Sequence, residues 1–256
     1  MKYDALIITN LPNYYKINLF NEIAKTCKLY IVFIAASEGR RNADFLTTDN
    51  QGKFDYAILS TSLENRSYIK TCLKLRGIIR SHTFSKLILG EWVNIEYWFA
   101  LLFFKKANTS MMLESSIHSV TGIGVKEVVK KIFLSRISKI FANGNKHAEL
   151  ARFLRFSGEI LVTNGLGVIN YTPHIRVDKT DKFLYVGRLS PEKNLNLVVE
   201  VFNDLPYELT IVGEGADRET LEAKANPNIK LMGYVKIKGL NKLYRSHSAL
   251  VLVSTD

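Results

Sequence analysis

The 256-residue chain has only two cysteines, Cys27 and Cys72, and only five prolines. Two cysteines cannot form a disulfide framework or a cysteine-based zinc site, and they fit a reducing cytosol. The N-terminus enters a short apolar segment at once and lacks the hydrophobic region and small-residue cleavage site of a secretion signal. With 47% hydrophobic and 23% charged residues, the composition excludes collagen-like and wholly disordered chains. We therefore expect a cytoplasmic globular protein of one large or two ordinary domains.

Long hydrophobic runs are absent as well. The most apolar segment, Glu96–Phe104, is far shorter than the roughly 20 residues that a bilayer requires. Glu91 and Asn94 interrupt any longer count. The segment is therefore predicted to be a core helix and not a membrane span.

Acidic residues are scarce in the N-terminal part of the chain. The formal charge is +11, and residues 1–164 contain 23 Lys and Arg against 13 Asp and Glu, whereas residues 165–256 contain 12 against 11. Nucleic acid, anionic lipid and a phosphorylated substrate would all suit this excess. The basic residues of Lys126–Arg155 are interpreted either as a solvated surface or as a peripheral contact with the inner face of the cell membrane. Nucleic acid is the weaker alternative, because no recognition motif accompanies the charge.

Short apolar runs alternate with segments of helical period along the whole chain. Tyr3–Thr9 and Leu29–Ala35 are predicted strands, and Tyr15–Cys27 between them is a predicted helix with one apolar face. Lys126–Phe141 is likewise predicted to be a helix, and Ala249–Ser254 the last strand. This alternation is typical of stacked βα units and a parallel sheet, so we predict an α/β fold of doubly wound, Rossmann-like type.

The alternation loosens between residues 165 and 180, where turn residues such as Gly165, Gly167 and Pro173 gather. We therefore predict an N-terminal domain over residues 1–164, a linker over 165–180 and a C-terminal domain over 181–256. The last of these is roughly half the size of a typical domain and stops just after a buried strand. The chain is expected to be either a fragment or a truncated natural product.

The most informative segment is Phe183–Asn194, in which a predicted strand runs into Gly187, Arg188 and, shortly afterwards, Lys193. A helix is predicted to begin just beyond, and its N-terminal N–H groups add partial positive charge. Two cations beside a helix start can hold a diphosphate without metal and stabilise it as a leaving group. The alternative is an ordinary turn with two solvent-facing cations.

Further blocks follow in order: Leu209–Gly215 (LTIVGEG), Leu231–Val235 (LMGYV) and Ala249–Ser254 (ALVLVS). Together with the preceding GR and EKN blocks, their order and spacing resemble the nucleotide-sugar-binding half of the retaining, family-4 (group 1) glycosyltransferases with the GT-B fold. That fold consists of two Rossmann-like domains facing across a cleft. The second would be incomplete here.

The N-terminal half resembles the bacterial surface-polysaccharide members of the same family. Leu11–Phe20 is similar to their LPxYRxxLF opening, and Glu38–Arg41 with Phe54–Tyr56 is similar to their E-x-R and FDY stretch. Leu89–Trp92 resembles their GGW block, and Leu113–Ser116 resembles their ES block. The resemblance therefore extends over almost the whole chain.

The resemblance implies a donor site on the C-terminal half. Arg188 and Lys193 would contact the donor diphosphate, and Gly187 would give the backbone close access to it. The main chain around Tyr234 and Val235 would contact the nucleobase. The remaining donor-side residues that it implies are Glu214, Gly215 and Leu240.

The resemblance also implies an opposing surface on the N-terminal half, at the end of the first strand, where α/β sheets bind ligands. Glu114 stands where many relatives have a histidine that touches the transferred sugar, and it is our candidate catalytic residue, whose carboxylate could hydrogen-bond sugar hydroxyls or steer the acceptor hydroxyl. A purely structural carboxylate is the alternative. His118 is a second candidate, and a structural or solvated histidine is the alternative. The implied cleft loop comprises Asn10, Pro12, Tyr14 and Tyr15.

One family feature is missing from the sequence. The second carboxylate pair of the family would follow Ala249–Ser254 and begin just beyond Asp256, and Val253 stands where proline is usual. The predicted function is transfer of a sugar, with retention, from a nucleotide-sugar donor to a glycolipid or polysaccharide acceptor. The alternatives are a truncated, non-catalytic remnant that binds nucleotide or membrane, and a nucleotide-sugar epimerase. No metal or cofactor is predicted, because the five histidines lack metal-ligand spacing.

Overall fold

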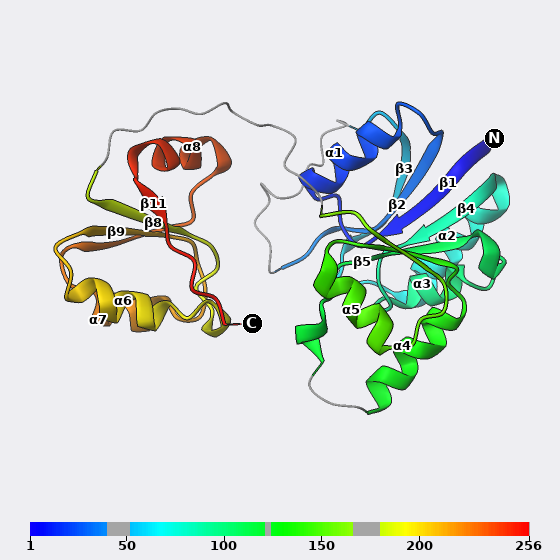
Figure 1. Ribbon diagram of the computed structural model, residues 1–256. Coiled ribbons are helices and arrows are strands. Elements are labelled where there is room, and N and C mark those ends of the chain that lie inside the picture. Colours follow the sequence, from blue (N-terminus) through cyan, green and yellow to red (C-terminus); the bar gives the residue numbers. More distant parts are fainter. Residues whose placement is uncertain (40–51, 121–123, 166–179, 256) are drawn as a thin grey trace. The chain divides into compact units, whose positions relative to one another are not determined.

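The computed structural model describes residues 1–39, 52–120, 124–165 and 180–255. The chain divides into two compact units, Met1–Asn170 and Tyr171–Asp256, and each has its own parallel sheet (Figure 1). Arg40 and Arg41 of the E-x-R stretch lie outside the described residues, as does most of the expected linker.

The first unit is built on a seven-stranded parallel sheet in the order β3-β2-β1-β4-β5-β6-β7. Its strands are β1 (Lys2–Thr9), β2 (Leu29–Ser37), β3 (Asp55–Ser62), β4 (Thr83–Leu89), β5 (Thr109–Leu113), β6 (Lys139–Ala142) and β7 (Glu159–Val162). Its helices are α1 (Tyr14–Ile23), α2 (Tyr68–Ser81), α3 (Ile95–Ala100), α4 (Val125–Ser135) and α5 (Asn145–Phe153). Short 3-10 turns cover Lys106–Asn108 and Ile117–Ser119.

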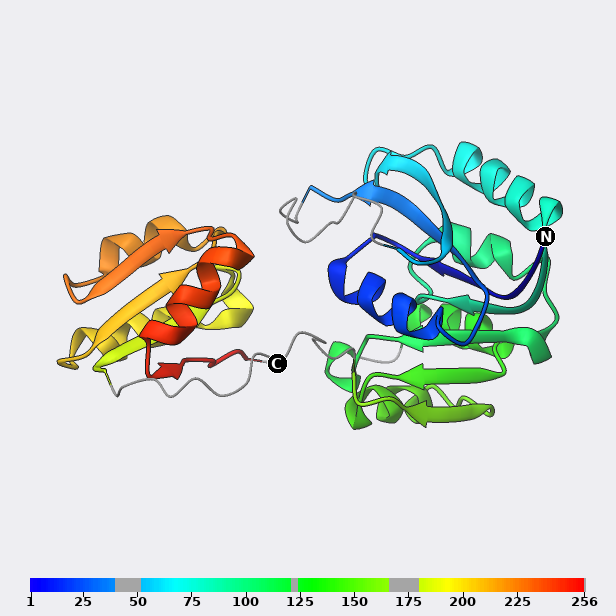
Figure 2. The same cartoon turned by 90° about the horizontal axis from the view of Figure 1, so that it is seen from above.

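Helices cover both faces of this sheet, which is why its strands are apolar on both sides. Along β1, Leu6 and Ile8 point into the larger core, which packs under α2, α3, α4 and α5. Ala5 and Ile7 point the other way, into the core under α1. Figure 2 shows α1, in blue, lying over one face of this sheet. The architecture confirms the predicted α/β, doubly wound class.

The second unit repeats the scheme on a smaller scale. Its four parallel strands lie in the order β10-β9-β8-β11. They are β8 (Lys182–Val186), β9 (Glu208–Val212), β10 (Ile229–Gly233) and β11 (Ala249–Leu250), and the helices are α6 (Leu195–Asn203), α7 (Arg218–Lys224) and α8 (Ile237–Ser246). Within this unit, α6 and α7 cover one face of the sheet and α8 the other (Figure 1).

Two predicted elements are wrong in extent. The helix expected over Lys126–Phe141 ends at Ser135, and Lys139–Ala142 forms strand β6 between β5 and β7. The reason lies in the burial pattern, because Ile140 and Ala142 are buried and alternate with half-buried neighbours, as in a strand. The strand expected over Ala249–Ser254 is paired only at Ala249 and Leu250.

A buried ion pair joins α3 to the segment before α2. Glu96 is 0% exposed, and its Oε1 accepts from Arg66 Nε at 2.8 Å and from Thr71 Oγ1 at 2.7 Å. Arg66 also donates to Asn94 Oδ1 at 2.9 Å. Burial alone would raise the pKa of Glu96, but the hydrogen bonds from Arg66 and Thr71 outweigh it and hold the pKa below its usual value.

We expect the first unit to lose stability at acid pH through Glu96. A carboxyl whose folded pKa is lowered contributes stability above its unfolded pKa of about 4.3, and this contribution is lost as the pH falls through the folded value. Glu96→Gln should therefore cost about 1–2 kcal/mol at pH 7 and progressively less below about pH 4. Urea unfolding of both proteins between pH 7 and pH 3 measures this. Parallel stability curves would contradict it.

Within the described residues, no helix combines the length and the apolar character needed to cross a membrane.

Candidate functional site

Three adjacent strands of the second unit, β8, β9 and β10, end at the same edge of the sheet, and their loops are tied together by backbone hydrogen bonds. Gly187 N–H donates to the Val212 carbonyl at 3.0 Å, and Gly213 N–H donates to the Gly233 carbonyl at 2.8 Å. Leu189 N–H donates to the Glu214 carbonyl at 2.9 Å. The loops therefore form one fixed backbone platform at the carboxyl edge, where open α/β sheets bind ligands.

Glycine is required where these loops touch. Gly213 has φ +147°, and a Cβ there would overlap the carbonyl oxygen of Gly187. A Cβ at Gly215 would likewise overlap the carbonyl oxygen of Leu189. Both contacts are with backbone, which cannot move aside as a flexible side chain can. The VGEG sequence is therefore explained by loop packing.

Two cations stand at this platform. Arg188 has 66% of its side chain exposed and reaches Glu192 Oε1 at 3.2 Å, an exposed pair that contributes little to stability. Lys193 Nζ lies 3.4 Å from Ser254 Oγ, after β11. The hydrogen bond from Ser190 is the main cause that lowers the pKa of Glu192. Both cations remain accessible to an anionic ligand.

Glu214 joins the loops after β9 and β10. Its Oε1 accepts from Tyr234 N–H at 3.3 Å and from Arg218 Nη1 at 3.1 Å. Val235 follows Tyr234 and lies against Gly239 in the first turn of α8, where a Cβ would stand 2.7 Å from Val235 Cγ1. The structure thus places the residues predicted for the donor side on three neighbouring loops and the start of α8. These residues are Gly187, Arg188, Lys193, Glu214, Gly215, Tyr234, Val235 and Leu240.

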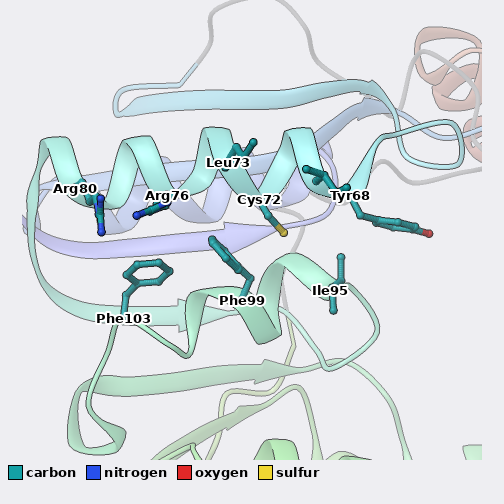
Figure 3. Close-up of a pocket in the computed structure, with 9 residues that line it drawn as sticks. Tyr68, Cys72, Leu73, Arg76, Arg80, Ile95, Phe99 and Phe103 are labelled. Carbon is teal, nitrogen blue, oxygen red and sulfur yellow. The ribbon is translucent and has the colours of Figure 1, made fainter.

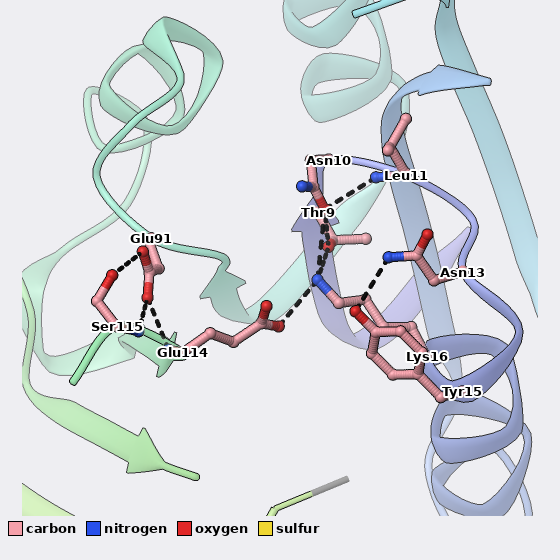
Figure 4. Close-up of polar contacts among 9 residues, drawn as sticks. All are labelled: Thr9, Asn10, Leu11, Asn13, Tyr15, Lys16, Glu91, Glu114 and Ser115. Carbon is pink, nitrogen blue, oxygen red and sulfur yellow. Dashed lines mark hydrogen bonds and ion pairs between the residues drawn. The ribbon is translucent and has the colours of Figure 1, made fainter. Parts of the chain in front are cut away.

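The corresponding edge of the first unit carries a second polar cluster (Figure 4). Lys16, on α1, is only 3% exposed, and its ammonium lies 2.9 Å from Glu114 Oε1. The same ammonium donates to Thr9 Oγ1 at 3.1 Å and to Asn10 Oδ1 at 3.3 Å. Its three N–H donors therefore have three acceptors, as a buried ammonium requires. Glu114 keeps 37% of its side chain exposed and can reach a ligand.

A second carboxylate fixes the chain around Glu114. Glu91, in the loop after β4, accepts from the backbone N–H groups of Glu114 and Ser115, and its Oε2 accepts from Ser115 Oγ at 2.6 Å. Because β1, β4 and β5 are neighbours in the sheet, the residues that follow them meet at one edge. Glu114 is thus held from both sides, through its backbone by Glu91 and through its carboxylate by Lys16.

The predicted cleft loop is only partly available to a ligand. Pro12 is buried, whereas Asn10, Tyr14 and Tyr15 are partly exposed. Tyr15 OH accepts from Asn13 Nδ2 at 3.1 Å, and the rings of Tyr14 and Tyr15 meet edge to face at 5.8 Å. Pro12 therefore shapes the loop from within.

His118, in the Ile117–Ser119 turn, is exposed. Within the part of the chain that the structure describes, no hydrogen bond or ion pair joins it to Glu114 or Lys16. Among the described residues, the two candidate catalytic residues therefore share no hydrogen-bonded network.

Lys16 and Glu91 were not among the predicted site residues. Lys16 lies four residues, about one helical turn, before the apolar Phe20. Both side chains therefore lie on the same buried face of α1. A lysine on a buried helix face is uncommon, and this was a usable signal. Glu91 directly follows Gly90 at the end of β4, in the block that resembles GGW. Its position at a strand end was the corresponding signal.

Comparison with known proteins identifies the class of fold. The lipopolysaccharide outer core galactosyltransferase WaaB is 16% identical, with a TM-score of 0.65 over 99% of this chain and 74% of that one. Anabaena HepE in complex with UDP and glucose is 12% identical, with a TM-score of 0.68 over 100% of this chain and 75% of that one. The UDP-GlcNAc 2-epimerase of Methanocaldococcus jannaschii is 12% identical, with a TM-score of 0.57 over 95% and 76%. The two Rossmann-like units therefore have the GT-B type of fold.

The family model for glycosyl transferases group 1 matches residues 172–256. This range contains the whole loop platform from Gly187 to Val235 and both of its cations. No curated protein matches the chain. The family match and the fold support the coarser part of the resemblance, a group 1 glycosyltransferase, whereas the retaining, surface-polysaccharide type stays a prediction.

Proposed function

We propose that the protein is a glycosyltransferase that binds a nucleotide-sugar donor on its second unit. The observation that carries this proposal is the loop platform after β8, β9 and β10, which bears Arg188 and Lys193 and lies within the group 1 family match. Accessible cations beside close-packed backbone suit a diphosphate, because charge-assisted hydrogen bonds stabilise both the bound donor and the charge that grows as it leaves. No step requires a metal.

Transfer would proceed with retention to a lipid-linked or polysaccharide acceptor. The bond from the sugar C1 to the diphosphate oxygen breaks, and an acceptor hydroxyl attacks C1 from the same face. The hydroxyl proton passes to the departing phosphate oxygen, so the protein supplies no nucleophile. Arg188 and Lys193 neutralise the leaving diphosphate, while the main chain at Tyr234 and Val235 meets the nucleobase, with Glu214, Gly215 and Leu240 beside it.

Glu114 supplies the acceptor-side group in this proposal. It is ion-paired with Lys16 at 2.9 Å and remains partly exposed, so it can accept hydrogen bonds from sugar hydroxyls. Lys16 acts on Glu114 and not on the sugar, since its own N–H groups are all engaged within the protein. His118 stays a weaker proposal, because it is exposed and lies outside this hydrogen-bonded cluster.

We expect Arg188→Ala and Lys193→Ala each to weaken binding of a nucleoside diphosphate by about 10-fold or more, the usual worth of one charge-assisted hydrogen bond. Titration calorimetry with UDP, GDP, ADP and dTDP measures this. Lys182→Ala is the matched control, because Lys182 opens β8 at the opposite edge of the sheet and pairs with Glu208 at 3.0 Å. Unchanged affinity in both site variants, or no binding of any of the four nucleotides, would contradict the proposed donor site.

The epimerase and remnant alternatives make different predictions. The epimerase of M. jannaschii shares the fold, so conversion of UDP-N-acetylglucosamine without release of UDP would favour that function. Nucleotide binding with neither epimerisation nor release of UDP would favour a non-catalytic remnant. Release of the nucleoside diphosphate together with a glycosylated acceptor supports the transferase.

A further inference from the structure

An apolar groove of about 540 Å³ runs between α2 and α3 on the first unit (Figure 3). Large apolar side chains line it, among them Ile69, Leu73, Ile95, Phe99 and Phe103. Ile69 is 75% exposed, Leu73 57% and Ile95 48%. Scattered exposed leucines need no explanation, but a contiguous apolar strip on two packed helices indicates a binding surface.

The surroundings of this groove are basic. Arg76 and Arg80 line it directly, and Lys70, Lys105 and Lys106 lie on the same two helices or just after them. Residues 67–110 contain seven Lys and Arg and only two acids. Both acids are engaged inside the unit, since Glu96 is buried against Arg66 and Glu91 binds the backbone near Glu114. Among the described residues, no ion pair neutralises the basic side chains beside the groove.

Cys72 adds to the apolar character of the groove. Its side chain points into the space between α2 and α3 (Figure 3). Burial, with a smaller contribution from the Glu96 charge, raises the pKa of the Cys72 thiol. The raised pKa favours the uncharged thiol, which suits the apolar lining of the groove.

We propose that this α2–α3 face docks the protein on an anionic phospholipid bilayer. The exposed aliphatic side chains enter the boundary between headgroups and acyl chains, and the arginines and lysines meet lipid phosphates. A second copy of the chain is a poorer occupant, because a symmetric contact would bring the same basic side chains together. Nucleic acid is a still poorer occupant of this face, since its charged phosphates would lie against the apolar strip.

The proposal differs from the interpretation of Lys126–Arg155 as the membrane contact. Several bases of that segment already have acidic partners: Lys139 pairs with Glu159 at 2.8 Å, and Lys146 pairs with Glu149 at 3.0 Å. Val128 on α4 is nevertheless 55% exposed, so α4 offers a rival surface that the same experiment can test. Docking does not depend on the proposed transferase activity and is measured separately from it.

The test is co-sedimentation of the full chain with vesicles of phosphatidylcholine alone and with 30% phosphatidylglycerol, a composition chosen so that ~30% of headgroups are anionic. We expect binding only to the anionic vesicles and a loss of binding at high salt. Leu73→Glu should lower the partition coefficient by about 10-fold or more, and Arg76→Ala with Arg80→Ala by about 25-fold, or fivefold for each charge. Leu73, Arg76 and Arg80 are exposed, so the variants should melt like the wild type.

Leu197→Glu is the matched control, because Leu197 is 47% exposed on α6 of the second unit. It should bind vesicles as the wild type does. An equal loss in Leu197→Glu, or a loss in Val128→Glu but not in Leu73→Glu, would overturn the assignment to α2 and α3. A further result would also overturn the assignment: the wild type sediments as a dimer and Leu73→Glu as a monomer. The α2–α3 face would then serve self-association.

Discussion

Gly213→Ala is expected to destabilise the second unit by about 2–6 kcal/mol, because a strained backbone conformation and an overlap with backbone each cost about 1–3 kcal/mol. Gly213 has φ +147°, and its new Cβ would meet the Gly187 carbonyl oxygen. Relief would require breaking the Gly187 to Val212 and Gly213 to Gly233 hydrogen bonds, which hold the three loops together. Nucleotide binding should be lost with the platform.

Calorimetric melting measures this prediction. For a unit of this size, such a cost lowers the melting temperature by about 8 °C or more. Gly77→Ala is the matched control, since Gly77 lies within α2 and a Cβ there meets no atom within 4 Å. That change should stabilise the first unit by about 0.5–1 kcal/mol. If Gly213→Ala melted within about 1 °C of the wild type, loop packing would not be what requires glycine there.

Local patterns predicted the fold well, because each strand of a parallel sheet is a short apolar run that can be recognised alone. Because these predictions use only short segments of sequence, they also led to the error at β6. Only three residues separate β6 from the end of α4, and Ile137 and Ile140 continue an apolar spacing that suits a helix equally well. Lys139–Ala142 becomes a strand by pairing with β5 and β7, which gives it the alternating burial described above.

The candidate site likewise has a part that could be predicted from local sequence and a part that could not. Gly187, Arg188 and Lys193 lie within one short segment, so their proximity could be predicted from sequence. Lys16 and Glu114 are far apart in the chain and meet only because β1, β4 and β5 are adjacent in the sheet. The order of the strands is a property of the whole fold, and it cannot be predicted from the residue pattern of any single segment.

The Lys16–Glu114 pair should respond asymmetrically to substitution. Glu114→Ala leaves the ammonium of Lys16, a side chain only 4% exposed, with two neutral acceptors, at a cost of about 2–4 kcal/mol. Lys16→Met removes the buried charge and leaves Glu114, 37% exposed, to be solvated by water, so its cost should be about 1 kcal/mol. Urea unfolding of the single variants and of Lys16→Met with Glu114→Gln measures the coupling. Additive costs would contradict a pair that acts as one unit.

Activity should separate the roles of the two residues. Glu114→Gln keeps the shape of the side chain but removes its charge, and we expect about a 100-fold loss in the rate of sugar transfer. Affinity for the nucleoside diphosphate should not change, because its predicted ligands are on the second unit. Lys16→Met should lower the rate less, and Lys16→Arg should restore part of it, since a guanidinium can still pair with Glu114. A Glu114→Gln protein with full activity would leave the carboxylate a structural role only, and the acceptor-side group would then have to be sought elsewhere along the edge formed by β1, β4 and β5.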